Sequence, residues 1–249
     1  MSGHSKWATI KRKKAATDQA RGKMFSKYIK EITIAARHGG GDAEANPRLR
    51  TAIAAAKTVN MPASNIERAI KRGTGEVEGA HYEETHYEGY GPGGVAVLVE
   101  VATDNRNRTT GDVRNLFVKN GGNLGEAGSV AYLFKPRGVI TVERGAVPED
   151  TLIEVALDAG ADDVSTEGES FEVLTPPAAL EAVKDALARK NIPIANAELT
   201  KLATLQVPVS ERDAAAVLRL VDALEDHDDV QKVYANFSVA DDVLARLTR

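Results

Sequence analysis

Residues 5–31 read SKWATIKRKKAATDQARGKMFSKYIKE, and we expect the rest of the chain to be organised around this basic stretch. Between Lys6 and Lys30 it holds nine basic residues and one acidic residue, Asp18. Clustered Lys and Arg are the electrostatic footprint of a phosphate-binding surface. Charge alone leaves a second interpretation open, in which the stretch is a solvated tail without a partner. The single Trp, Trp7, lies among these cations, where an indole either stacks on a base or anchors the stretch to the first helix.

The charge is divided unevenly along the chain. The 249 residues have a formal net charge of −4. Residues 1–78 contain 16 Lys and Arg against 7 Asp and Glu, whereas residues 79–249 contain 16 against 29. The first part is therefore strongly basic and the second strongly acidic, and each is judged separately. A basic head on an acidic body favours a partner rich in phosphate.

Composition excludes several classes of protein. The chain has no Cys, which excludes disulfides, thiolate catalysis and cysteine metal sites, and fits a reducing cytoplasm. No apolar run approaches the roughly 20 residues of a membrane helix. The N-terminus lacks the apolar core of a secretory signal. We therefore expect a cytoplasmic protein without a membrane partner.

Three helices are predicted in the basic part. Residues 1–22 show little apolar periodicity and predict an extended or partly ordered arm. A helix follows over residues 23–37; at about 100° per residue its apolar side chains and its lysines fall on opposite faces, which predicts one buried face and one basic face left in water. Asn46-Pro47 predicts the N-cap and first turn of a second helix. A third helix is expected after Pro62.

A change of pattern follows the third helix. Residues 73–94 contain seven glycines and predict a hinge or long loop. The glycines of residues 89–94 have G-x-G-x-x-G spacing, but they precede a strand, whereas a dinucleotide site needs them between a strand and a helix. A strand over residues 95–101, a helix over 109–119 and a returning strand over 129–134 predict a β-α-β unit.

The remaining chain predicts two further units. Residues 136–202 follow the order β-α-β-β-α-β of a ferredoxin-like fold, and residues 204–239 add another β-α-β. We expect an α+β fold class with three domains, a basic helical one and two ferredoxin-like α+β ones, one inserted in the other. The expected bounds are 1–78 for the basic three-helix domain with its arm, 79–135 plus 203–249 for the second domain, and 136–202 for the inserted one. Two consecutive open sheets are the competing topology.

Few candidate sites lie outside the basic stretch. Arg106 and Arg108 flank a predicted helix N-terminus, where free N–H groups favour anions; they are interpreted either as phosphate contacts or as partners of acidic groups in their own domain. His81 and His86 lie in an acidic loop, but their spacing fits no familiar zinc pattern. The acidic run at 225–229 lacks calcium-loop spacing and predicts a solvated turn. No nucleophile elbow occurs, so we expect no catalytic residue, metal or cofactor.

Several segments along the chain form a recognisable pattern. They are GHSKWA at 3–8, RGK at 21–23, NPRLR at 46–50, NMP at 60–62, NIERAIKRG at 65–73, YEGYGPGGVA at 87–96, TDNRNRT at 103–109, KNGGNLG at 119–125 and DDV at 228–230. In these segments the chain resembles the YebC/PmpR family of probable transcriptional regulatory proteins, whose relatives include the mitochondrial translational activator of cytochrome oxidase subunit one. Residues 42–46 and the region near 200–208 depart from the family pattern, away from the basic stretch. The resemblance implies three domains and a non-enzymatic, cytoplasmic role in gene expression.

Three functions compete. The first is a DNA-binding transcriptional regulator, and the second, which the resemblance also implies, is a ribosome-associated RNA-binding translation factor that activates translation or relieves stalling at proline-rich sequences. The third is a metal-dependent enzyme using His81 and His86, which the residues support least. Phosphate contacts do not distinguish DNA from RNA. A flexible basic arm favours RNA shape or non-specific binding, whereas the resemblance favours DNA.

The expected nucleic-acid contacts are the cations of the basic part, its one Trp and the two arginines beyond the hinge. They are Lys6, Trp7, Lys11, Arg12, Lys13, Lys14, Arg21, Lys23, Lys27, Lys30, Arg48, Arg50, Arg68, Lys71, Arg72, Arg106 and Arg108. The partner is therefore expected to be DNA, or ribosomal RNA within the ribosome. No small-molecule substrate is indicated, and the oligomeric state is left open.

Overall fold

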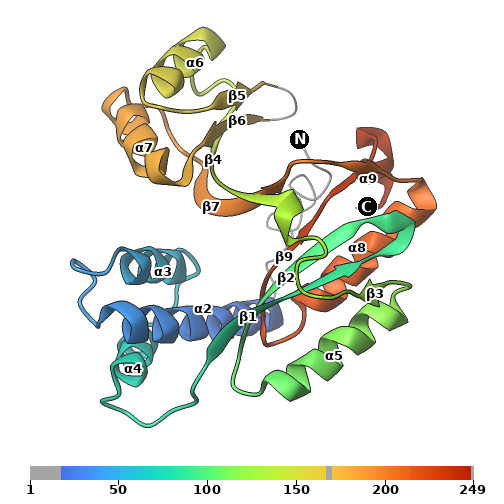
Figure 1. The fold of residues 1–249 in the computed structure, drawn as a ribbon. Helices are drawn as coiled ribbons and strands as arrows, with labels where there is room; N and C mark the ends of the chain where they lie inside the picture. The colour runs from blue at the N-terminus through green and yellow to red at the C-terminus, as the bar shows by residue number, and fades with distance from the viewer. Residues whose placement is uncertain (1–17, 167–169, 248–249) are drawn as a thin grey trace.

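Helices come first along the chain and two four-stranded sheets follow, so the fold is α+β as predicted (Figure 1). The computed structural model describes residues 18–166 and 170–247. The first part of the basic stretch, with Lys6, Trp7 and Lys11–Lys14, lies outside the described residues. The helices of the N-terminal part lie beside the sheets and contact one of them directly (Figure 1).

The first three described helices, which we call the helical unit, pack around a small apolar core. They are α2 (Asp18–Gly39), α3 (Pro47–Thr58) and α4 (Ala63–Thr74). Ile32, Leu49 and Ile66 are buried where the three helices meet. α2 and α4 cross closely at Gly73, because a Cβ atom there would lie 2.4 Å from the backbone oxygen of Thr33. This close approach explains why glycine occupies a helix interior.

The first helix begins earlier than the sequence pattern predicts. The arm was expected to reach residue 22, but residues 18–22 already belong to α2. This segment carries no apolar stripe that periodicity could detect. Its Gln, Ala and Arg are nevertheless good helix formers, so the helix extends toward the N-terminus without one.

Asn46 joins the end of α2 to the start of α3, as predicted for an N-cap. Its side-chain oxygen accepts a hydrogen bond from the backbone N–H of Leu49 at 3.1 Å. Its amide nitrogen donates to the backbone oxygens of Ala35 at 2.8 Å and Gly40 at 2.9 Å. The buried side chain therefore has hydrogen-bond partners for both its oxygen and its nitrogen. These bonds fix the path of the chain between the two helices.

The sheet that contacts the helical unit, here called the central sheet, has the strand order β3-β1-β2-β9. Its strands are β1 (Glu83–Tyr90), β2 (Ala96–Thr103), β3 (Asn123–Leu124) and β9 (Val230–Ala235). Helices α5 (Arg106–Lys119) and α8 (Glu211–Glu225) supply the other half of its core. β2 alternates little because both of its faces are covered, one by these helices and the other by Val130 and Phe134.

Three local predictions in this region are wrong. The predicted hinge at 73–94 contains strand β1, whose sequence does not resemble a strand because three of its eight residues are Glu and one of these, Glu88, is buried. The predicted strand at 129–134 is a 3-10 turn, Ala131–Leu133, that leads into a later strand. Helix α5 begins at Arg106 rather than at residue 109, because Asn105 caps it by accepting a hydrogen bond from the N–H of Arg108 at 3.1 Å.

The second four-stranded sheet, here called the distal sheet, has the ferredoxin-like order β5-β6-β4-β7, and its neighbouring strands are antiparallel. Its elements are β4 (Phe134–Glu143), α6 (Glu149–Asp158), β5 (Asp163–Ser165), β6 (Ser170–Thr175), α7 (Leu180–Arg189) and β7 (Asn196–Ala203). Ile140, Val173 and Leu187 are buried between the sheet and its two helices.

The chain leaves the central sheet, forms the distal sheet and returns. The return is shown by β9, which pairs antiparallel with β2, as the nested arrangement requires. The first strand of the β-α-β unit predicted over 204–239 is only β8 (Val207–Pro208), which pairs in parallel with β10 (Phe237–Ser238) outside both larger sheets. The last described helix is α9 (Asp241–Leu247). The division into three domains with the bounds given above stays a prediction.

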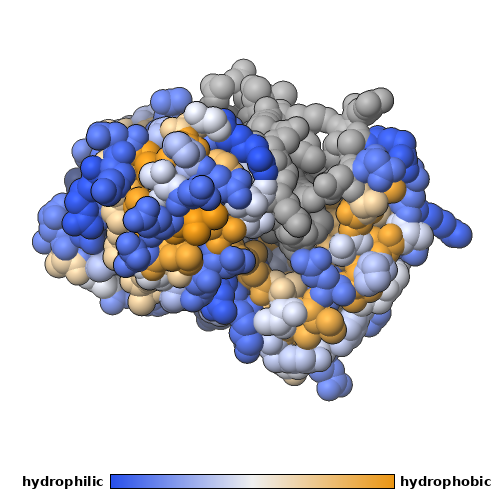
Figure 2. Space-filling model, turned by 90° about the horizontal axis from the view of Figure 1, so that it is seen from above, coloured by the Kyte–Doolittle hydropathy of each residue, from blue (hydrophilic) through white to orange (hydrophobic). Residues whose placement is uncertain are grey.

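The surface seen from above is largely hydrophilic, with hydrophobic side chains exposed between the polar ones (Figure 2). Large apolar side chains that are exposed include Leu157 of α6, at 46%. Among the described residues no helix combines the length and the apolar character needed to cross a membrane.

The buried hydrogen bonds of Asn46 predict a stability effect. Asn46→Ala removes an N-cap and leaves two backbone oxygens with one partner fewer, so we expect the free energy of unfolding to fall by about 2 kcal/mol. Urea denaturation followed by circular dichroism measures it. Thr51→Ala, at an exposed site on the same helix, is the control and is expected to change it by less than about 0.5 kcal/mol. Equal effects of the two substitutions would show that the cap does not join the helices.

Candidate nucleic-acid interface

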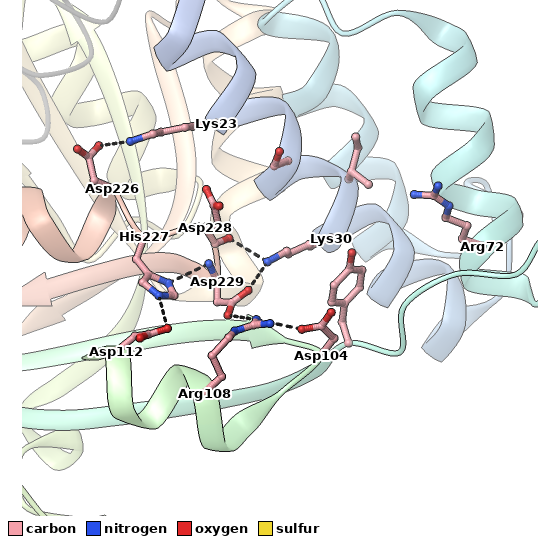
Figure 3. A pocket seen from close by; sticks show the side chains of 13 residues that line it. Lys23, Lys30, Arg72, Asp104, Arg108, Asp112, Asp226, His227, Asp228 and Asp229 are labelled. Carbon is pink, nitrogen blue, oxygen red and sulfur yellow. Dashed lines mark hydrogen bonds and ion pairs between the residues drawn. The ribbon is translucent and has the colours of Figure 1, made fainter. Parts of the chain in front are cut away.

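A cleft of about 830 Å³ lies where α2 meets the central sheet. Its walls come from α2, the end of α4, the segment before β1, the N-terminal half of α5 and the turn between α8 and β9 (Figure 3). Both signs of charge line it, and most of the charged groups point toward one another rather than into free space (Figure 3). The cleft is therefore bordered by an internal network of ion pairs.

Asp229 is the centre of this network. Its carboxylate accepts hydrogen bonds from the ammonium of Lys30 at 2.6 Å, the guanidinium of Arg108 at 2.6 Å and the hydroxyl of Thr109 at 2.7 Å. Thr103 donates a longer one at 3.3 Å. Asp229 is only 4% exposed. We call these five residues the Asp229 hub; it ties α2 to β2, α5 and the start of β9.

The electrostatics of the hub follow from this geometry. Burial raises the pKa of Asp229, because it penalises the charged form. Hydrogen bonds from Lys30, Thr109 and Arg108 oppose burial and outweigh it, so the net pKa lies well below the ordinary 3.8 of an aspartate. Asp229 is thus a buried anion stabilised by two cations and two hydroxyls, and it is ionised at neutral pH.

Lys30 lies inside the protein, so the predicted basic face of α2 is not left in water. Its side chain is buried, and besides Asp229 it donates to the backbone oxygens of Asp228 at 2.9 Å and Ala102 at 3.3 Å. One or two turns earlier, Lys27 donates to the backbone oxygen of Glu225 at 2.8 Å and Lys23 pairs with Asp226 at 3.2 Å. These three lysines contact the turn between α8 and β9. The prediction that the basic face of α2 is left in water is therefore wrong.

Arg108 pairs with acidic groups of the protein itself, which is the second of the two roles considered for it. It pairs with Asp104 at 3.0 Å as well as with Asp229, so its guanidinium binds acidic groups of its own sheet. Arg106, in the first turn of the same helix, is exposed. The two arginines predicted to act together are therefore separated in role, although both lie at the N-terminus of α5.

His227 completes the turn. Its Nδ1 accepts a hydrogen bond from the backbone N–H of Asp229 at 3.1 Å, and its Nε2 lies 3.4 Å from a carboxylate oxygen of Asp112 on α5 (Figure 3). Because Nδ1 accepts, Nε2 carries the proton and donates to Asp112. The acidic run at 225–229, predicted to be a solvated turn, instead receives the lysines of α2.

The other predicted cations of the helical unit differ in their surroundings. Arg48 is held by Glu31 at 2.9 Å and by Glu84 at 2.5 Å; its hydrogen bonds keep the pKa of Glu84 below its usual value. Arg50 donates to the backbone oxygens of Ala43 and Glu44, each at 3.2 Å. Arg48 is thus occupied by two carboxylates, whereas the head group of Arg50 lies at an exposed loop.

Three of the predicted cations lie on α4, two of them in its last turn. Arg68 and Lys71 are exposed, and neither forms an ion pair with another described residue. Arg72 is half-buried, lines the cleft, and has a buried Nε atom without a hydrogen-bond partner in the part of the chain that the structure describes. Arg21 lies in the first turns of α2.

No group of three or more potential metal ligands occurs among residues 18–166 and 170–247. The two histidines considered for a metal have other partners. His81 lies 3.0 Å from a guanidinium nitrogen of Arg37, and His86 lies 3.3 Å from Glu88, whose carboxylate also accepts backbone N–H groups of the loop after β3.

Sequence reasoning missed the Asp229 hub, although a signal for it exists. Lysines at 23, 27 and 30 have helical spacing, and the run at 225–229 is the most acidic short segment of the chain. Complementary charges far apart in sequence predict a contact only when a fold brings them together, and the pairing of β2 with β9 does so here. Thr103 and Thr109 carried no signal, because nothing in the sequence marks a threonine hydroxyl as the donor to a distant carboxylate.

Two family models match the chain. One describes the TACO1/YebC protein N-terminal domain and matches residues 5–76; the other describes the TACO1/YebC second and third domain and matches residues 82–237. A relative from Dictyoglomus turgidum is 56% identical over 249 residues, with 100% of each chain covered. A relative from Desulfatibacillum aliphaticivorans is 57% identical, with 98% of this chain and 99% of the relative covered. Both are named "Probable transcriptional regulatory protein".

A solved structure shares this architecture. It is the crystal structure of a conserved hypothetical protein from Aquifex aeolicus, with a TM-score of 0.80 and 51% sequence identity. The match covers 90% of this chain and 93% of that chain. The arrangement of helices and sheets is therefore common to both proteins.

The Asp229 hub predicts a strong dependence of stability on one carboxylate. Asp229→Asn removes the anion and leaves the ammonium of Lys30 buried, so we expect the free energy of unfolding to fall by about 3–5 kcal/mol. Asp226→Asn is the matched control in the same turn: it removes an exposed partner of Lys23 and is expected to cost less than about 1 kcal/mol. Chemical denaturation of the full chain measures both.

The pH dependence of the same variants tests the electrostatic cause. Because the folded pKa of Asp229 lies below its ordinary value, the stabilisation is present above about pH 3.8 and is lost as the pH falls toward the folded pKa. Wild type should therefore lose stability more steeply than Asp229→Asn in this acidic range. Parallel curves for the two proteins, or equal costs of the two substitutions at neutral pH, would contradict the assignment of Asp229 as the ionised centre.

Proposed function

The chain belongs to the TACO1/YebC family, and from this premise we propose that it is a DNA-binding regulator of transcription that works by binding rather than by catalysis. The names of its relatives support a regulatory role. DNA binding is our inference from the distribution of charge.

The observation that carries the proposal is the division of cations in the basic part. Lys23, Lys27 and Lys30 are used to hold α2 on the central sheet. Arg68 and Lys71 of α4 are exposed and form no ion pair with another described residue. An exposed cation without an ion-pair partner in the protein does not have to break an existing contact when it binds phosphate. Its whole interaction with the phosphate therefore contributes to affinity.

The basic residues before the first described helix extend this charge. Lys11, Arg12, Lys13 and Lys14 stand together in the sequence, and no acidic residue occurs before Asp18. We propose that they neutralise DNA phosphates together with Arg68 and Lys71. Phosphate contacts orient a protein on the duplex without reading its sequence, so this part supplies affinity rather than specificity.

A second candidate function is the binding of ribosomal RNA in the control of translation. It is favoured by one observation: the exposed cations of the helical unit lie on α3 and α4 rather than along a single helix. Cations spread in this way suit recognition of the shape of a folded RNA. Comparison of duplex DNA with structured RNA as probes separates the two functions.

Replacement of Lys11, Arg12, Lys13 and Lys14 by Ala tests the proposal directly. We expect weaker binding to duplex DNA and a plot of log affinity against log salt that is less steep by up to about four counterions. Arg68→Ala with Lys71→Ala should lower the slope by about two. Fluorescence anisotropy at several salt concentrations measures both.

The control removes two exposed cations, Arg189 and Lys190, from the end of α7. It is expected to leave the slope unchanged, because the distal sheet takes no part in the proposed contact. An unchanged slope in the four-residue variant would overturn the role of the basic stretch. Tighter binding of structured RNA than of duplex DNA, with the same residues responsible, would favour the second candidate.

A further inference from the structure

Helix α5 presents a polar, cationic face within the acidic part of the chain, residues 79–249. The exposed residues of the helix, which we call the α5 face, are Arg106, Asn107, Gly111, Arg114, Asn115, Val118 and Lys119; Arg108 is exposed too but is engaged in the Asp229 hub. The opposite side of α5 is fixed, because Thr109, Val113 and Phe117 are buried against the central sheet. In Figure 1 the helix lies along the lower edge of the molecule.

The charge of the α5 face is uncompensated within the described chain. Arg106, Arg114 and Lys119 form no ion pair with another described residue. The only acidic residue of the helix, Asp112, is half-buried and turned toward His227. The excess of cations on α5 contrasts with the rest of residues 79–249, which together carry 16 Lys and Arg against 29 Asp and Glu. Cations gathered on one helix of an otherwise acidic part favour an anionic partner.

Gly111 is the second, independent observation. It lies in the interior of α5, where glycine is the poorest helix former after proline. A Cβ atom at this position would meet nothing within 4 Å, and its backbone is not in the left-handed region. Neither the backbone conformation nor packing against the described residues therefore requires a glycine here. A surface glycine does allow a bulky partner to come close to the helix backbone.

Val118 and the two asparagines narrow the kind of partner. Val118, near the C-terminal end of this polar face, is 63% exposed, and an apolar side chain gains nothing from contact with water. In the major groove, Arg binds the edge of guanine and Asn binds the edge of adenine, each through two hydrogen bonds. An apolar side chain contacts the methyl group of thymine. The major groove of DNA admits an α-helix, whereas that of duplex RNA is too narrow for side chains to read.

We propose that the α5 face docks on the major groove of a DNA duplex, with Arg106, Arg114 and Lys119 as its cationic contacts and Gly111 as the point of closest approach. The inference deepens the proposed function and rests on it. It adds a second contact with the same duplex, made by the acidic part of the chain and not by the basic stretch. This second contact reaches the base edges as well as the phosphates.

Two variants of the full chain test the docking surface, with duplex DNA as the probe. Arg114→Ala with Lys119→Ala should weaken binding about tenfold at ~0.1 M salt and lower the salt slope by up to about two. Gly111→Leu should weaken binding by steric exclusion while the melting temperature stays the same or rises, because Leu favours a helix more than Gly does. A drop in melting temperature with unchanged binding would show that Gly111 has a structural role only.

The controls separate this inference from the proposed function. Arg189→Ala with Lys190→Ala should change neither quantity. If wild type does not bind duplex DNA at any salt concentration, the proposed function fails. If wild type binds and loses affinity on removal of Lys11–Lys14, but the α5 variants bind normally, the inference alone is overturned. It is also overturned if the α5 variants lose affinity for structured RNA and not for duplex DNA.

Discussion

One buried carboxylate, that of Asp229, holds the helical unit on the central sheet. It binds Lys30 from α2 and Arg108 and Thr109 from α5. Removal of either cation leaves the buried carboxylate with one ionic partner instead of two. Ion pairs of this kind contribute less to net stability than to a unique geometry, since their charges lose hydration on burial. We infer that the hub fixes the orientation of α2, and through it that of α3 and α4, relative to α5.

The hub also decides which cations are available to a partner. In the N-terminal part, the lysines of α2 that contact the turn between α8 and β9 are engaged within the protein, and so is Arg48. Arg68 and Lys71 on α4 remain exposed, and a further set of exposed cations lies on α5. A count of charge along the sequence cannot separate these two classes. The structure can, because burial and partner distances differ for each side chain.

The sequence predicted the helices best, because caps and apolar stripes are local signals. Asn46-Pro47 marked the start of α3, and the ferredoxin-like order of the distal sheet was evident from its alternating elements. Strand β1 was missed because three of its eight residues are Glu and one of these, Glu88, is buried. Lys30 was assigned to water because helical periodicity places it opposite the apolar face. Only the contact with the turn after α8, made across 199 positions of sequence, places it inside.

Lysine acetylation followed by mass spectrometry, with and without duplex DNA, tests the division of cations most directly. We predict that Lys30 reacts little in either state, because it is buried on Asp229, whereas Lys71 and Lys119 react in the free protein and are protected by DNA. Full reactivity of Lys30 in the free protein would contradict the hub. Equal reactivity of Lys71 and Lys119 with and without DNA would contradict the account of where the nucleic acid binds.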